Sequence, residues 1–275
     1  MNPCLIIAQS IRVNLKYIDD KAPGLLRELL ELLSDAYELE TKWSQLVGNS
    51  LFEFAYTHVI EPNIQYLYYL VLQCAIPQAL YTMRLIIEAL MASAYADIVT
   101  ATGGDLHATL VAKLRDYASR FSMSNLVNPP KEFRDYYAWV VKKMEEPLKW
   151  LTDRIGLKDG GLIGFIYQTY DRLSKLIHPV TMINGRQSLG GIVIDALLDY
   201  VYGNLPANRH LYAPFECDDN DYEWLRELRL NTTFIRAILH MVTYTWAANT
   251  GLMRKEDLEQ LKQKIEEEFT TIVNY

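Results

Sequence analysis

The sequence predicts an all-α protein, a helical bundle of about 8–10 helices, on three observations. Apolar residues recur at steps of three and four through most of the chain, which is the spacing of a helix that buries one face. Alternation of β-type runs with helices is absent, and no glycine-rich loop follows a strand. Hydrophobic residues make up 50% of the chain and charged residues 22%, enough apolar surface for a large core.

We expect one helical domain over residues 1–275. Its N-terminal helices, over 1–60, should pack on a core of about 62–180. An irregular insert should follow over 179–221, and a C-terminal helical pair over 222–275 should close the chain.

The first long helical stripe follows Pro23-Gly24 and should end at Gly48-Asn49. A second long helix should run from Pro62 to about Thr100 with a kink at Pro77. Residues 64–83 include no charged side chain, and such a run is about as long as a membrane span. Its glutamines and proline, and the helical spacing that continues after it, favour a buried central helix and no membrane contact.

Later elements are predicted from caps and prolines. Asp105 should cap one helix, and Pro129-Pro130 should open another that Pro147 interrupts. A helix from about Leu162 should end at His178, because Pro179 disfavours the α conformation before it.

In the insert, Asn184-Gly185 could close a small hairpin near 181–194, and a short helix should follow Gly190-Gly191. The closing helices should cover about 222–249 and 254–273. The last of them carries an apolar stripe that fits packing on its own core or a dimer seam: Leu258, Leu261, Ile265, Phe269 and Ile272.

Charge and cysteine content limit the partners. A net charge of -7 and a pI near 5.3 repel nucleic acid and anionic lipid, so RNA could bind only at a local basic patch. Cys4, Cys74 and Cys217 are odd in number and far apart, which suits a reducing compartment better than a disulfide framework. With no basic region before its short apolar stretch, the N-terminus does not resemble a secretory signal, and we expect a cytoplasmic protein.

One short constellation, between Tyr170 and His178, could carry chemistry. Asp171, Ser174 and His178 share a stripe of their helix, with Arg172 roughly 100° to one side. Arginine can neutralise a phosphate and histidine can move a proton near neutral pH, so the cluster could act on a phosphodiester without a metal or other cofactor.

This arrangement resembles the HEPN superfamily of helical bundles, in which an arginine and a histidine separated by four to six residues lie at a helix end. Five residues separate Arg172 from His178. The resemblance implies a metal-independent ribonuclease or RNA-binding protein of a defence or toxin-antitoxin system, with a homodimeric site. Arg172 and His178 would be catalytic, and Tyr170, Asp171 and Ser174 would support them.

A second similarity lies upstream. The segment Arg84 to Leu90, followed by Tyr95-Ala96-Asp97, is similar to the first core helix of HEPN-like families, and the two matches cover about a third of the chain. The sequence departs from active members at Leu173, where they usually have Asn, Asp or His after the arginine.

A purely structural role remains an alternative for each candidate residue. A histidine in the last turn of a helix is favourable without catalysis, and Asp171 with Lys175 is an ordinary i,i+4 pair. Asp195 and Asp199 could hold a divalent cation or face solvent. Arg236 and His240 could add a basic edge to a site, but a partly buried structural pair fits their apolar neighbours better.

The remaining histidines stand alone, and neither a zinc motif nor a nucleophile elbow is present in the sequence. Two functions therefore stay open: a HEPN-like protein acting on RNA, and a non-catalytic helical interaction or scaffold protein with a protein partner.

Overall fold

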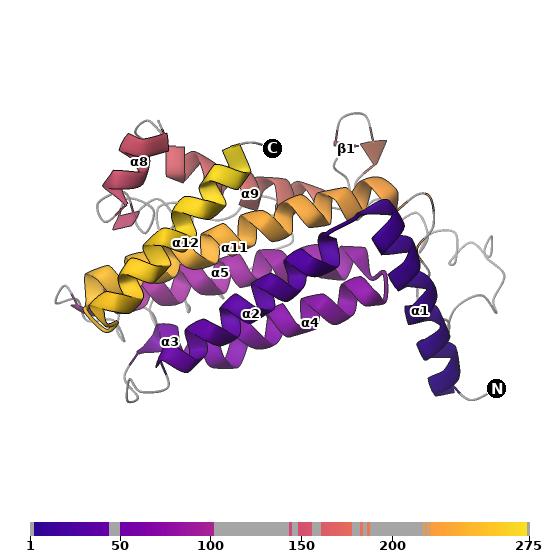
Figure 1. Ribbon diagram of the computed structural model, residues 1–275, viewed down its shortest axis with the longest axis horizontal. Helices are drawn as coiled ribbons and strands as arrows, with labels where there is room; N and C mark the ends of the chain where they lie inside the picture. Colours follow the sequence, from indigo (N-terminus) through magenta and orange to yellow (C-terminus); the bar gives the residue numbers. More distant parts are fainter. Residues whose placement is uncertain are drawn as a thin grey trace, which may run out of the picture. The chain divides into compact units, whose positions relative to one another are not determined.

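The computed structural model describes residues 3–43, 50–101, 143–144, 148–155, 161–177, 182–183, 186–187, 217, 219 and 221–273. Almost all of this part is helical, so the all-α prediction is confirmed (Figure 1). The helices are α1 (Pro3–Lys21), α2 (Leu25–Trp43), α3 (Leu51–Ala55), the π-helix η1 (Tyr56–Ile60), α4 (Glu61–Leu72), α5 (Ile76–Ala101), α8 (Lys149–Ile155), α9 (Gly161–Ile177), α11 (Tyr222–Thr250) and α12 (Lys255–Val273).

The chain forms two compact units. Unit 1 comprises residues 1–36, 61–86 and 169–233, and unit 2 comprises residues 37–60, 87–168 and 234–275. The helices α2, α5, α9 and α11 contribute residues to both units.

In unit 1, the turn between α1 and α2 uses Gly24 at φ +92°, a conformation that residues with a Cβ rarely adopt. Glu28, in the first turn of α2, accepts hydrogen bonds from Arg229 Nε at 2.8 Å and from Thr233 Oγ1 at 2.9 Å. These bonds tie the start of α2 to α11. Helix α1 also contacts α4 (Figure 1).

The prediction of a single helix over 62–100 is wrong, because α4 ends at Leu72 and α5 begins anew at Ile76. Cys74 lies at φ +54°, and the Ala75 N–H donates to the carbonyl of Leu70, the bond that closes a helix with a left-handed residue. Pro77 therefore lies in the first turn of a new helix, where its missing N–H has no cost, and does not kink an existing one.

The expectation that the cysteines stay unpaired is also wrong: Cys74 and Cys217 form a disulfide across a sequence separation of 143. Asn14 of α1 helps to hold the two cysteines together, because its side chain forms hydrogen bonds with both segments of the chain that the disulfide joins. Its side-chain nitrogen donates to the carbonyl of Leu72 at 3.1 Å, and its oxygen accepts from the Cys217 N–H at 3.0 Å. Both cysteines are buried in unit 1.

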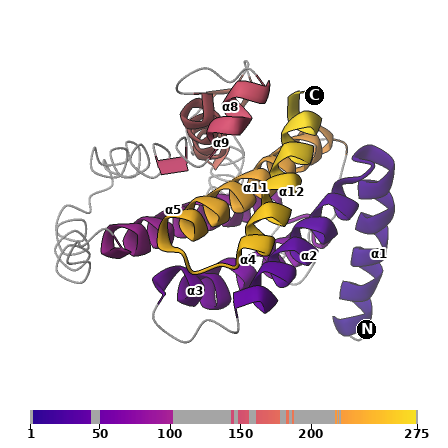
Figure 2. The same cartoon turned by 60° about the vertical axis from the view of Figure 1, so that its left-hand side comes forward.

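Unit 2 is built on aromatic packing. Phe52 stacks on Trp246 with their ring centroids 4.8 Å apart, and Phe165 contacts both Phe234 and Phe269. Helix α8 contacts α12 (Figure 2). In α12, Leu261, Ile265 and Phe269 are buried, so its stripe packs on the core of its own unit.

The bounds of α9, α11 and α12 lie within one residue of the predicted ones. Helix α9 covers 161–177, and α11 and α12 are separated at Gly251, which lies at φ +69°. The strands β1 (Met182–Ile183) and β2 (Arg186–Gln187) pair antiparallel on either side of Asn184-Gly185. The helices predicted at Asp105 and Pro129-Pro130, the break at Pro147 and the short helix after Gly191 lie outside the described residues.

Residues 64–83 are largely buried on one side, as predicted, through Ile64, Leu67, Ile76, Leu80 and Met83. Among the described residues, no helix is both long enough and apolar enough to cross a membrane.

Candidate functional site

The predicted motif lies near the C-terminal end of α9. Tyr170 and Leu173 are buried there, Arg172 is half-buried, and Asp171 faces solvent. Ser174 belongs to the same helix, but its side chain is not among the described ones. His178 lies outside the described residues. The position of His178 relative to Arg172 therefore lies outside the described residues.

Arg172 forms an ion pair with Glu227 of α11. Its Nε donates to Glu227 Oε2 at 2.7 Å, and its Nη2 contacts both carboxylate oxygens. The two side chains are 41% and 30% exposed, so the pair lies at the edge of the packed region. A carboxylate that engages a guanidinium by several hydrogen bonds satisfies its directional donors as well as its charge.

Tyr170 belongs to a second contact in unit 1. Its hydroxyl accepts hydrogen bonds from Arg84 of α5, from Nε at 3.1 Å and from Nη2 at 2.7 Å, and the guanidinium carbon lies 5.0 Å from the ring centroid. The two sequence segments that carry the HEPN resemblance thus contact each other through Arg84 and Tyr170. Because Tyr170 is only 6% exposed, this contact is part of the packing between α5 and α9.

Leu173 is fully buried on α9. A polar side chain, which the HEPN resemblance would require after the arginine, would at this position enter the core instead of an open site. The motif region therefore has a buried apolar residue next to an arginine that already binds a carboxylate.

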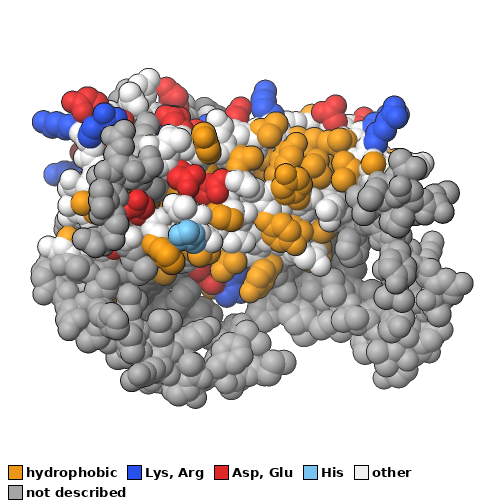
Figure 3. Space-filling model, turned by 90° about the horizontal axis from the view of Figure 1, so that it is seen from below, with side chains coloured by type: hydrophobic (Ala, Val, Ile, Leu, Met, Phe, Trp, Pro, Cys, Tyr) orange, Lys and Arg blue, Asp and Glu red, His pale blue; other side chains and the backbone are white. Residues whose placement is uncertain are grey.

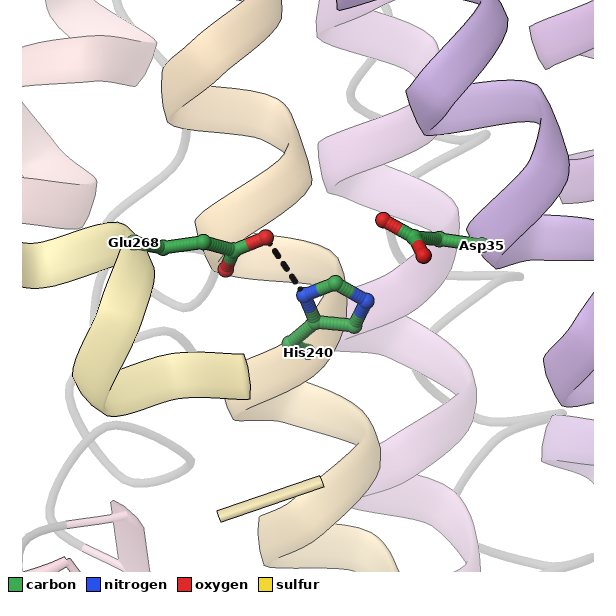
Figure 4. A group of neighbouring side chains, drawn as sticks. All are labelled: Asp35, His240 and Glu268. Atoms are coloured by element: carbon green, nitrogen blue, oxygen red, sulfur yellow. Dashed lines mark hydrogen bonds and ion pairs between the residues drawn. The ribbon is translucent and has the colours of Figure 1, made fainter. Parts of the chain in front are cut away.

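Unit 2 contains a partly buried cluster that includes Arg236 and His240, the second pair singled out from the sequence. His240 Nδ1 lies 2.8 Å from Glu268 Oε1 (Figure 4). Arg236 Nε lies 3.2 Å from the same oxygen. His240 is 0% exposed, and the Glu268 side chain is 10% exposed.

This arrangement favours a purely structural role for Arg236 and His240. Glu268 neutralises the arginine and contacts the imidazole; His240 is fully buried on α11, and Arg236 and Glu268 are partly buried on α11 and α12. Asp35, also drawn in Figure 4, belongs to unit 1.

Sequence reasoning missed Glu227, Glu268 and the hydrogen-bonding role of Asp97. Asp97 Oδ2 accepts from Ser50 Oγ at 2.6 Å, from the Phe52 N–H at 3.0 Å and from Trp246 Nε1 at 2.8 Å. The one available signal was the position of Asp97 in an otherwise apolar stretch of α5, since a buried carboxylate needs donors around it. For Glu227 and Glu268 no local signal exists, because each partner lies on another segment of the chain.

The other candidates remain apart. His58 is exposed on η1, where its ring lies 4.5 Å from that of Phe54. Asp195, Asp199, His107 and His210 lie outside the described residues.

No protein-family model, no curated protein and no solved structure matches this chain. The contacts of its own side chains are therefore the basis for a functional proposal.

Proposed function

We propose that this chain is a non-catalytic helical interaction protein, whose bundle presents surfaces to other macromolecules. The observation that carries the proposal is the ion pair between Arg172 and Glu227. An arginine that acts on a phosphodiester must offer its donors to the phosphate, and here a carboxylate of the same chain binds Nε and Nη2 of Arg172.

A phosphate that displaced the Glu227 carboxylate from Arg172 would meet two electrostatic costs. The released carboxylate would stay close to the incoming anion, and like charges at such short range repel. The net charge of -7 adds a field that opposes RNA from a distance. Leu173 supports the same conclusion, because the position after Arg172 holds a buried apolar side chain where active HEPN ribonucleases usually have a polar one.

RNA cleavage provides the test. We would incubate the purified protein with mixed RNAs in EDTA and compare it with Arg172→Ala, His178→Ala and Glu227→Ala. Arg226→Ala is the matched control, because Arg226 is an exposed arginine of α11 with a surface ion pair. We expect no cleavage by any of the five proteins.

Two outcomes would overturn the proposal. The first is cleavage by the natural sequence that disappears in Arg172→Ala and persists in Arg226→Ala. The second is cleavage that appears only in Glu227→Ala and is abolished by adding Arg172→Ala, since the carboxylate would then mask a reactive arginine.

A further inference from the structure

The exposed face of α4 is unusual for a surface helix. Pro62, Gln65, Tyr66 and Tyr69 are exposed, and Gln73 extends the same face just beyond the helix end. Tyr66 is 54% exposed and Tyr69 57%. The opposite face is buried through Ile64, Leu67, Leu70 and Val71, so these tyrosines are not part of the core of unit 1. We call the exposed residues 62, 65, 66, 69 and 73 the α4 face.

The α4 face is uncharged. No acidic or basic residue occurs between residues 62 and 83, a range that also includes Tyr81 of α5, which is 60% exposed. Glu61, which precedes it, is buried and accepts a hydrogen bond from Gln65. Exposed positions of α1 and α12 in contrast carry charges, for example Arg12, Lys16 and Glu256. Hydrophobic side chains gather on the side of the molecule that Figure 3 shows.

We infer that the α4 face binds a second copy of this chain. Two copies of a protein with a net charge of -7 repel each other, so they approach most readily where neither presents a charge. Phenol and amide groups both donate and accept hydrogen bonds, so a surface of Tyr and Gln can pair with its own copy about a two-fold axis. Tyrosine is also enriched in the centres of protein interfaces.

Other occupants fit this surface less well. Single-stranded nucleic acid stacks on aromatic rings but needs cations for its phosphates, and residues 62–83 provide none. A strongly basic protein would gain more from the acidic surfaces elsewhere on the chain than from a neutral one. The second copy is therefore the occupant that the charges favour.

This inference rests on the proposed function, since it names the surface and the partner of an interaction protein. Sedimentation equilibrium on the full chain tests it, over concentrations from about 1 to 200 µM, where weak dimers dissociate. We expect a reversible dimer, and we expect Tyr66→Glu and Tyr69→Glu each to raise its Kd by roughly tenfold or more. Tyr37→Glu is the control, because Tyr37 is 61% exposed on α2 but lies outside the α4 face.

A pair of opposite charges separates loss of the interface from loss of the fold. Tyr69→Glu and Tyr69→Lys should each be monomeric over most of this range, while an equal mixture of the two should dimerise, because the heterodimer brings opposite charges together. Circular dichroism and the midpoint of urea unfolding should match those of the natural sequence in each variant.

The inference is overturned if the natural sequence stays monomeric at the highest concentration. It is equally overturned if Tyr37→Glu weakens the dimer as much as the α4 substitutions do, or if the mixture associates no better than its components. A monomer that also fails to cleave RNA rejects only the second copy as partner, whereas cleavage that depends on Arg172 rejects the proposed function itself.

Discussion

At the residue scale, Asp97 accepts hydrogen bonds from three groups that are far apart in the chain. Ser50 and Phe52 lie at the start of α3, and Trp246 lies on α11. Ser50 Oγ in turn accepts from the Glu53 N–H at 3.0 Å, which caps α3. One carboxylate thus fixes both the start of a short helix and the orientation of Trp246, the largest fully buried side chain among the described residues.

Asp97→Ala should lower the free energy of unfolding by about 3 kcal/mol or more, because buried donors without an acceptor each cost about 1–3 kcal/mol. Urea unfolding followed by tryptophan fluorescence measures the difference. The control is Asp153→Ala, an exposed aspartate of α8, which should change stability by less than about 0.5 kcal/mol. Equal effects of the two substitutions would contradict the role assigned to Asp97.

The candidate site shows what sequence patterns cannot give at this scale. Periodicity places Arg172 on α9 and Tyr170 beside it, and both placements are confirmed by the helix bounds. The partners Glu227 and Arg84 lie 55 and 86 residues from them in the chain. Hydrogen bonds over such separations depend on how helices pack, and helix spacing alone carries no information on that.

At the element scale, the first turn of α3 contains both the N-cap Ser50 and Glu53, an acid whose pKa is shifted. Partial burial, followed by repulsion from Asp97, raises the pKa of Glu53 above its ordinary value. A carboxyl group whose pKa is raised on folding binds a proton more readily in the folded chain. Its contribution to stability is therefore present at acidic pH and is lost as the pH rises through the folded-state pKa.

Glu53→Gln should accordingly raise the melting temperature at pH 7, where the glutamate is ionised at a cost. The difference should shrink as the pH falls below the ordinary glutamate pKa of 4.5, because both side chains are then neutral. Thermal unfolding from pH 3 to pH 8 measures it, with Glu256→Gln in the first turn of α12 as the exposed control. A difference that grows toward acidic pH would contradict the assigned cause.

Most element boundaries were predictable because they depend on local chemistry. Gly251 marks a helix end within its own segment, and Pro179 marks the end of α9 to within one residue. The helix start predicted at Pro62 is wrong, because α3, η1 and α4 follow one another without a break from Leu51 to Leu72. The break between α4 and α5 was missed because Cys74 adopts a positive φ that glycine usually supplies. The contact that accompanies this conformation is the disulfide to Cys217, which is not local.

At the scale of the whole molecule, the disulfide closes a loop of 143 residues and restricts the unfolded chain more than the folded one. By the chain-entropy argument, removing it should cost about 2–5 kcal/mol. We expect the double variant Cys74→Ser/Cys217→Ser to unfold at lower urea, and a reductant to have the same effect on the natural sequence but none on the variant.

Thiol counting in denaturant provides an independent check. The chain has three cysteines, so one reactive thiol should be found without reductant and three after reduction. Three thiols in freshly purified, unreduced protein would contradict the pairing of Cys74 with Cys217.

The same crosslink also changes how the chain would respond to mechanical tension. A pull on the two termini cannot extend the segment between the bonded cysteines while the sulfur bridge is intact. At roughly 3.3–3.6 Å per residue, this loop holds about 500 Å of contour length. More than half of the polypeptide would thus stay out of the line of force until a reducing agent cleaves the bridge.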